Sequence, residues 1–230
     1  MKEKINYLLI LVIFFAKFSY TIGVKGEVPE VKVVKTNSPP ILDGKIDDQT
    51  WLEAALYGSK LTGFVNATGT ELIEYQPIVF VAYDDKNFYL AVRTYLPGTK
   101  NLQREKKEFS IDNDLIQIFL EPKMDGRYVQ YMVNWDGASS HPGINAAGLF
   151  DKIFWTVEIS IPWELLNIIP REGEIIGFNV CGAQSSTGAG WITWSPTYGG
   201  FHNPSRFGYL ILGSKLHIKK IPTKIEEDDF

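Results

Sequence analysis

Amide side chains recur on one face of two strands that the sequence predicts at 115–120 and 128–135. Successive side chains of a strand point to opposite faces, so these amides share a face, with a methionine between two of them. Sugar hydroxyls bind amide, carboxylate or guanidinium groups, and the C–H face of a sugar packs on an aromatic ring. A phenylalanine in a glycine-containing loop is expected to supply that ring. The candidate carbohydrate-binding residues are Gln117, Gln130, Met132, Asn134 and Phe201.

No arrangement of residues in the sequence predicts catalysis. Hydrolysis of a glycoside needs two carboxylates that face each other across a cleft. Asp84 and Asp85 are instead typical of a turn, and Asp112 and Asp114 of a strand end. A serine and a histidine that are close in sequence, as at 139–141, do not by themselves form a triad. We therefore expect a binding protein without catalytic residues.

The sequence predicts neither a metal site nor a cofactor. His141, His202 and His217 lack the spacing of zinc ligands. Asp43 and Asp47 lie in a predicted loop and offer the oxygen ligands that calcium takes, so a structural calcium ion is the alternative. Turn and cap formation is the favoured role of these two aspartates.

The elements that would position the amides are short strands closed by turn signals. Turns are expected at 84–87 and 123–126, and short helical turns at 47–55 and 162–166. The pattern predicts an all-β fold, an antiparallel β-sandwich with jelly-roll or immunoglobulin-like layers and one or two short helical turns. The predicted strands are 78–83, 88–95, 115–120, 128–135, 154–161, 175–181, 191–194 and 207–212.

The first residues are typical of an export signal. Lys2 and Lys4 precede an apolar run at 7–15 that is too short to span a bilayer, and Lys17 prevents the run from continuing. We expect cleavage near Gly23, which predicts a secreted protein, extracellular or periplasmic, with no membrane span after cleavage. A retained N-terminal anchor is the alternative.

Charge and cysteine content narrow the choice of partners. The formal net charge is −4, with 23 basic and 27 acidic residues, so the chain lacks the basic surplus that nucleic-acid binding requires. Cys181 is the only cysteine, which excludes an internal disulfide. Its apolar strand predicts a buried, unreactive thiol.

Four segments, in order along the chain, resemble the family 9 carbohydrate-binding modules. They are PILDGKIDDQTW at 40–51, VAYDDKNFYLAV at 81–92, the pair NDLIQIFLEP and YVQYMVN within 113–134, and a set within 155–208 that includes WTVEISIPW, IGFN and GFHNPSRFG. The resemblance implies an antiparallel β-sandwich related to the DOMON group, and ligand binding on a concave sheet face. It also implies association with polysaccharide-degrading enzymes. We therefore expect a signal peptide at 1–23, a linker or edge strand at 24–37, the family 9-like domain at 38–213 and a charged tail at 214–230.

The chain departs from the sugar-binding members of that family at the site itself. Those members clamp a sugar between two tryptophans and use a basic residue on the sheet. The corresponding positions here hold Ile111, Phe201 and Met132, and Gln117 and Cys181 replace a glutamate and a glutamine. The resemblance therefore implies the fold more firmly than the sugar clamp.

The tryptophans are expected to serve mainly the core, because large aromatic side chains dominate core burial. This applies to the four in scaffold motifs, whereas Trp191 and Trp194 lie near the expected site, where core and site roles are evenly balanced. The scaffold tryptophans are Trp51, Trp135, Trp155 and Trp163.

The leading hypothesis is a secreted protein that binds poly- or oligosaccharide in support of polysaccharide degradation, without its own catalysis. One alternative is a haem-binding, DOMON-like electron-transfer domain that uses Met132 with His141 and His202. The other is an interaction module of an envelope complex that binds no sugar.

Overall fold

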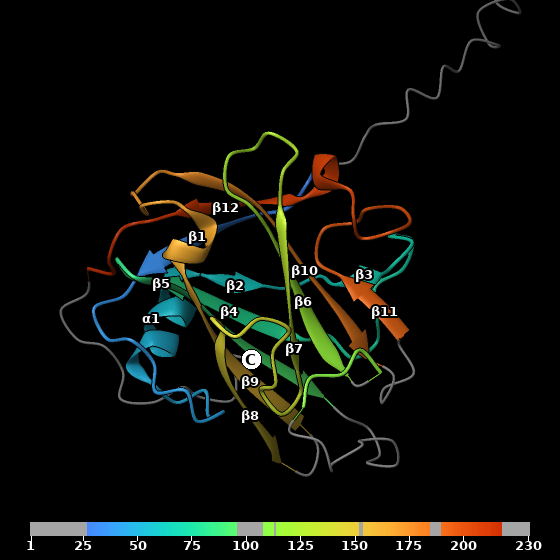
Figure 1. The fold of residues 1–230 in the computed structure, drawn as a ribbon, viewed down its shortest axis with the longest axis horizontal. Coiled ribbons are helices and arrows are strands. Elements are labelled where there is room, and N and C mark those ends of the chain that lie inside the picture. The colour runs from blue at the N-terminus through green and yellow to red at the C-terminus, as the bar shows by residue number, and fades with distance from the viewer. Residues whose placement is uncertain (1–26, 96–107, 113, 152–153, 185–189, 218–230) are drawn as a thin grey trace, which may run out of the picture.

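Two layers of β-strands enclose the apolar core of this protein (Figure 1). The computed structural model describes residues 27–95, 108–112, 114–151, 154–184 and 190–217. The predicted signal at 1–23 and most of the tail at 214–230 lie outside the described residues. Within the described part, no helix has the length and apolar character that crossing a membrane requires.

The front sheet, which faces the viewer in Figure 1, carries the predicted amide strands. Its centre is antiparallel, with β6 between β7 and β10, and β11 and β12 pair with different parts of β10. Its strands are β3 (Val65–Asn66), β6 (Leu115–Glu121), β7 (Val129–Asn134), β10 (Ile175–Gln184), β11 (Gly190–Thr193) and β12 (Gly208–Leu212).

The back sheet is an antiparallel array in the order β8–β9–β5–β4, with β2 also paired to β4. The strand β1 (Glu30–Lys35) joins the two sheets, because its first residues run parallel to β12 and its last two run parallel to β4. The strands of the back sheet are β2 (Lys60–Leu61), β4 (Ile78–Tyr83), β5 (Asn87–Tyr95), β8 (Asn145–Asp151) and β9 (Phe154–Pro162).

The core between the sheets follows the period of two in each strand. From β6, Ile116, Ile118 and Leu120 point inward, and from β7, Tyr131 and Val133 do the same. Burial of these apolar side chains is the main stabilising contribution to the fold. The predicted β-sandwich is therefore confirmed.

The two predicted helical turns are present, and one of them covers the back sheet. The helix α1 (Gln49–Tyr57) buries Trp51 and Ala54 against the outer side of β4 and β5. The 3₁₀ turn η1 (Trp163–Leu166) follows Pro162 directly. A further 3₁₀ turn, η3 (Pro204–Arg206), precedes β12.

Glu158 ties the segment before α1 to the back sheet. Its side chain has no exposed surface, and it accepts hydrogen bonds from the indole Nε1 of Trp51 at 2.7 Å and from the backbone N–H groups of Asp43 and Gly44 at 3.0 and 2.8 Å. Burial raises the pKa of the Glu158 carboxyl to about 7, and these three donors partly oppose that rise. The glycine and the tryptophan of the 40–51 motif therefore have a scaffold role.

The structure also contains strands outside the eight predicted ones, namely β2, β3 and β8, and β1 lies in the 24–37 segment that was expected to be a linker or edge strand. The sequence of β8 is NAAGLFD, which lacks β-branched residues and is weak in strand propensity. Small residues are required there, because a Cβ atom at Gly148 would lie 2.0 Å from the carbonyl oxygen of Trp135. Tertiary packing therefore decides the structure of this segment.

The expectation for the tryptophans is confirmed except at Trp135. Trp51 and Trp155 have no exposed surface, and Trp163 and Trp194 are also buried. Trp135 is only partly buried, because it comes directly after the last residue of β7 and packs at the margin of the core.

Candidate functional site

The outer side of the front sheet carries the candidate residues from neighbouring strands. The pairing of β6 with β7 places Gln117 opposite Met132, Leu115 opposite Asn134 and Phe119 opposite Gln130. On the other side of β6, the pairing with β10 places Cys181 opposite Gln117. The period of two thus separates these residues from the core as the sequence predicted.

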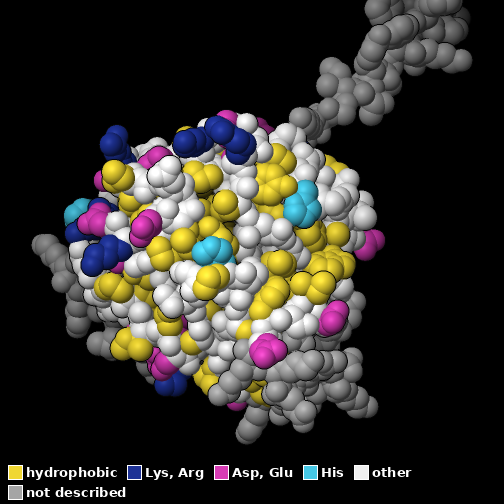
Figure 2. Space-filling view, in the orientation of Figure 1, with side chains coloured by type: hydrophobic (Ala, Val, Ile, Leu, Met, Phe, Trp, Pro, Cys, Tyr) yellow, Lys and Arg dark blue, Asp and Glu magenta, His cyan; other side chains and the backbone are white. Residues whose placement is uncertain are grey.

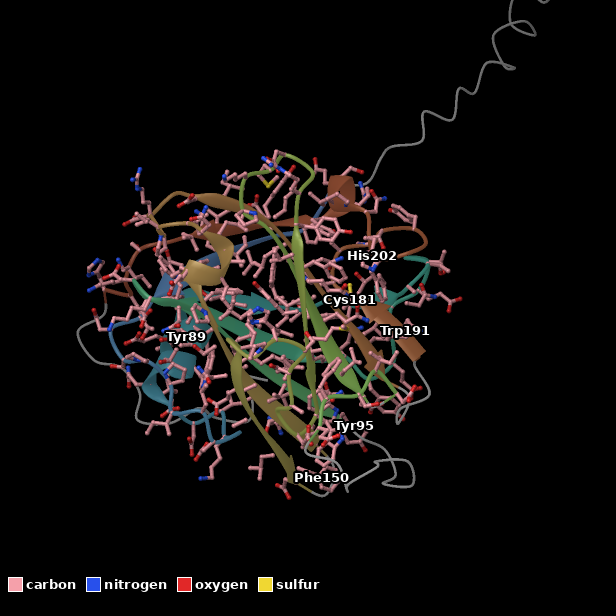
Figure 3. All side chains as sticks on the ribbon, viewed as in Figure 1. Tyr89, Tyr95, Phe150, Cys181, Trp191 and His202 are labelled. Carbon is pink, nitrogen blue, oxygen red and sulfur yellow. The ribbon has the colours of Figure 1, made fainter. Side chains whose placement is uncertain are left out.

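A hollow of about 350 Å³ opens on this outer side, where the loop after β11 meets β6, β11 and the start of the turn after β3. This is at the lower end of the volumes of small-ligand sites, which suits one sugar unit. Figure 3 shows His202, Cys181 and Trp191 close to one another in this region, beside β11. The hollow is lined by Ala67, Gln117, Trp191, Gly199, Gly200, Phe201 and His202.

Two aromatic rings form the apolar walls of the hollow. The ring centroids of Trp191 and Phe201 are 5.8 Å apart, and the ring planes meet at 65°. Trp191 is 48% exposed, which is high for a large aromatic residue, and Phe201 is partly buried. At this separation the two rings contact each other, so a ligand would pack against the apolar surface that they form together.

Gln117 supplies a nearly buried amide to the hollow. Its side chain is 6% exposed, and its Oε1 accepts a hydrogen bond from Nε2 of Gln130 at 2.6 Å. Among the described residues, the Nε2 group of Gln117 has no hydrogen-bond partner. An amide donor that lines an open hollow and has no protein partner there is suited to an acceptor on a ligand.

An aromatic cluster holds the loop that forms one side of the hollow. Phe119 of β6 contacts His202 and Phe207 at centroid distances of 5.5 Å each. Tyr128 packs against Phe207 at 5.4 Å, and its hydroxyl is 2.9 Å from Nδ1 of His202. The loop is therefore fixed on β6 and β7 before any ligand binds.

Beneath the hollow, polar side chains are satisfied among themselves. Asn179 donates to Thr193 Oγ1 and to the Ser195 carbonyl at 3.0 Å each, and Cys181 Sγ contacts the same Thr193 hydroxyl at 3.4 Å. Burial raises the pKa of the Cys181 thiol to about 12, so the thiol stays protonated and has no nucleophilic role. The prediction of an unreactive buried thiol agrees with this position.

Asn134 lies on the predicted face, but its amide is used within the protein. It is completely buried, its Oδ1 accepts from the Ser110 backbone N–H at 2.8 Å, and its Nδ2 donates to the Ser110 carbonyl at 2.7 Å. Asn134 therefore holds the segment that presents Ile111, which is 65% exposed. Met132 is partly buried on the same face, opposite Gln117.

The lining of the hollow contains no acidic, lysine or arginine side chain among the described residues. Figure 2 shows this side of the molecule largely in yellow and white with histidine side chains, and most charged side chains lie around its margin. His202 is the one histidine among the lining residues. The site is therefore built to recognise a ligand by shape and hydrogen bonds.

The other candidate groups do not converge on this hollow. His141 packs against Tyr131, whose side chain belongs to the core side of β7, at a centroid distance of 5.5 Å. Asp43 pairs with Lys45, at 2.8 Å between Oδ2 and Nζ, which lowers the pKa of the Asp43 carboxyl. In the described part of the chain, no three His, Cys, Asp or Glu side chains are grouped in a way that would hold a metal ion.

Comparison with known proteins identifies the family. The sequence profile described as "Carbohydrate family 9 binding domain-like" matches residues 41–215. The chain therefore belongs to this family of carbohydrate-binding modules. No curated protein matches the chain.

Solved structures support the same fold. A family 9 carbohydrate-binding module from Caldicellulosiruptor kristjanssonii, in complex with cellotriose, is 19% identical with a TM-score of 0.60, covering 84% of this chain and 98% of that chain. A family 9 carbohydrate-binding module from the same organism, in complex with glucose, is also 19% identical with a TM-score of 0.59, covering 83% of this chain and 100% of that chain. A protein from Bacteroides uniformis ATCC 8492, described as carbohydrate-binding, is 13% identical with a TM-score of 0.59, covering 81% of this chain and 100% of that chain.

The structure adds Trp191 to the residues that the sequence singled out for the site. From the sequence alone, Trp191 lies near the expected site, with core and site roles evenly balanced. The available signal was the alternation in GWIT of β11, where the buried Ile192 requires its neighbour Trp191 to point outward. What the sequence does not contain is the position of the 199–202 loop, which brings Phe201 against this ring.

Proposed function

We propose that this protein binds a poly- or oligosaccharide in the hollow formed by Gln117, Trp191 and Phe201. The observation that supports this most directly is the Gln117 amide, nearly buried and without a partner for Nε2 among the described residues, next to two aromatic rings. A sugar unit offers both an apolar C–H face for the rings and an oxygen for the amide.

The proposed site is sparse in polar groups. Gln130 positions Gln117 through their 2.6 Å hydrogen bond, Met132 contributes apolar surface beside it, and Asn134 acts through the Ser110 segment. With few hydrogen bonds and no charged partner, the affinity for one oligosaccharide should be modest, micromolar to millimolar, or about −4 to −8 kcal/mol.

The wider role depends on this binding. We infer that the protein is exported and supports polysaccharide degradation by holding a glycan, without catalysis of its own. This rests on the family, whose members are binding modules, and on the signal-like residues at the N-terminus. Polysaccharide-degrading enzymes are the partners that such a role implies.

Isothermal titration with soluble oligosaccharides tests the proposal. Because the similar module from Caldicellulosiruptor kristjanssonii holds cellotriose and glucose, these two sugars are the first ligands, with xylo-, manno- and chito-oligosaccharides after them. We expect at least one of them to bind one site per chain in the micromolar to millimolar range, roughly −4 to −8 kcal/mol.

If the folded protein gives no heat of binding with any sugar of the panel, the proposal is contradicted. An absorption band of a bound haem in the purified protein would favour the electron-transfer alternative instead.

A further inference from the structure

The polar groups of the hollow are unequally divided between donors and acceptors. The Oε1 atom of Gln117 already accepts from Gln130 at 2.6 Å, whereas its Nε2 donor group has no partner among the described residues. Apart from His202, the remaining lining residues present aromatic, methyl or glycine surface to a ligand. The inner part of the hollow therefore suits an oxygen that accepts a hydrogen bond.

A sugar hydroxyl meets this requirement only in part. A hydroxyl that accepts from Gln117 Nε2 still carries its own proton, which needs an acceptor of its own once water is excluded. The side-chain oxygen of Gln117 already accepts a short hydrogen bond from Gln130, so only its second lone pair is left for that proton. A carbonyl oxygen, by contrast, accepts the amide proton and brings no donor with it.

The walls of the hollow suit an apolar group attached to that carbonyl. Ala67, Trp191 and Phe201 offer methyl and ring surface. Gly199 has a φ of +149°, and an added Cβ atom at Gly199 or Gly200 would meet no other atom within 4 Å, so this side of the hollow stays open. A carbonyl that carries a methyl group is an acetyl group.

We propose that the site is selective for acetylated sugar units, with the acetyl carbonyl accepting from Gln117 Nε2 and the methyl group packing against the surface formed by Trp191 and Phe201. This inference rests on the proposed function, because it concerns the same hollow. N-acetylated and O-acetylated sugars share this chemistry. An acetylated unit matches the Gln117 donor and the apolar walls at the same time, whereas an unsubstituted unit meets the donor with a hydroxyl whose own proton also needs an acceptor.

The test compares matched ligands by titration calorimetry on the wild-type protein. The first pair is xylotriose with and without O-acetyl groups, and the second is N-acetylchitotriose against cellotriose. We expect the acetylated member of at least one pair to bind roughly tenfold more tightly, because the hydroxyl of the unsubstituted sugar brings a proton that also needs an acceptor in the hollow. The pair that shows the difference identifies the O-acetyl or the N-acetyl source.

Variants at Gln117 give a second readout. Gln117→Glu removes the N–H donor but keeps the shape of the side chain, and Gln117→Met removes all of its hydrogen bonding. In both variants the acetylated and the unsubstituted sugar should therefore bind with nearly equal affinity. Tyr209→Ala, an exposed aromatic of β12 outside the hollow, should keep the wild-type ratio. Thermal melts of each variant exclude loss of folding as the cause.

Equal binding of acetylated and unsubstituted sugars, or tighter binding of the unsubstituted ones, would overturn this inference and leave the proposed function intact. A preference that persists in both folded Gln117 variants would overturn it as well. Failure of every sugar to bind would overturn the inference and the proposed function together.

Discussion

Replacement of Glu158 by alanine is expected to lower the free energy of unfolding by about 3–5 kcal/mol. The carboxyl group is completely buried and accepts from Trp51 Nε1 and from the backbone N–H groups of Asp43 and Gly44. Alanine leaves three donors without an acceptor at the point where the 41–51 segment and α1 attach to the back sheet. Chemical unfolding monitored by fluorescence measures the difference.

Glu164→Ala is the matched control for this prediction, because Glu164 is an exposed glutamate of η1 close by in the sequence. Its effect should stay within about 0.5 kcal/mol. An effect of Glu158→Ala no larger than that of the control would show that the 41–51 segment is held by other contacts.

The same carboxyl group makes stability depend on pH. Burial raises its pKa from 4.5 to about 7, so the folded protein binds a proton that the unfolded chain releases between these values. The contribution of Glu158 is therefore complete below pH 4.5 and is lost as the pH rises through 7, by about 3 kcal/mol in total. Glu158→Gln does not titrate, and its stability should not show this loss. Identical pH profiles for the two proteins would contradict the raised pKa.

Removal of either ring of the hollow is expected to remove most of the sugar binding. Trp191→Ala and Phe201→Ala each take away one wall, and an aromatic anchor in a small site contributes about 2 kcal/mol or more to binding. For a ligand of millimolar to micromolar affinity, this means a loss of roughly thirtyfold or more. Titration calorimetry with the best-binding oligosaccharide measures it.

Trp191→Ala should leave the melting temperature nearly unchanged, because the Trp191 side chain is about half exposed. Phe201 packs partly on Phe119 and Phe207, so its removal should have a small destabilising effect. Tyr209→Ala, which removes an exposed aromatic side chain elsewhere, should bind like the wild type. Wild-type affinity in both ring variants would show that the sugar binds elsewhere on the protein.

Much of the fold is predictable from the local sequence pattern. Alternation placed Ile116, Ile118, Tyr131 and Val133 in the core and Gln117 outside it. It failed for β8, where the small residues of NAAGLFD serve a close approach to Trp135 rather than strand propensity. For the 24–37 segment it left a linker or an edge strand open, because the place of β1 between two sheets depends on partners about 50 and 180 residues further along the chain.

The candidate site was predicted only in part, since strand pattern identifies a face but not the partners of each side chain. Gln117 and Phe201 line the same hollow, whereas the Asn134 amide is occupied by Ser110. That difference arises because the 108–112 segment folds back onto β7, and no periodicity encodes such a contact. Trp191 became a site residue only through the position of the loop that carries Phe201.

We propose sugar binding on the outer side of the front sheet, at the hollow between β6 and β11. The most direct measurement is a proton–nitrogen NMR spectrum of labelled protein during titration with the best-binding oligosaccharide. The side-chain N–H signals of Trp191 and Gln117 should move with the ligand concentration, while the indole signal of Trp51, hydrogen-bonded to Glu158 on the back sheet, should stay fixed. Ligand-dependent changes confined to the back sheet, with Trp191 and Gln117 unmoved, would contradict the account.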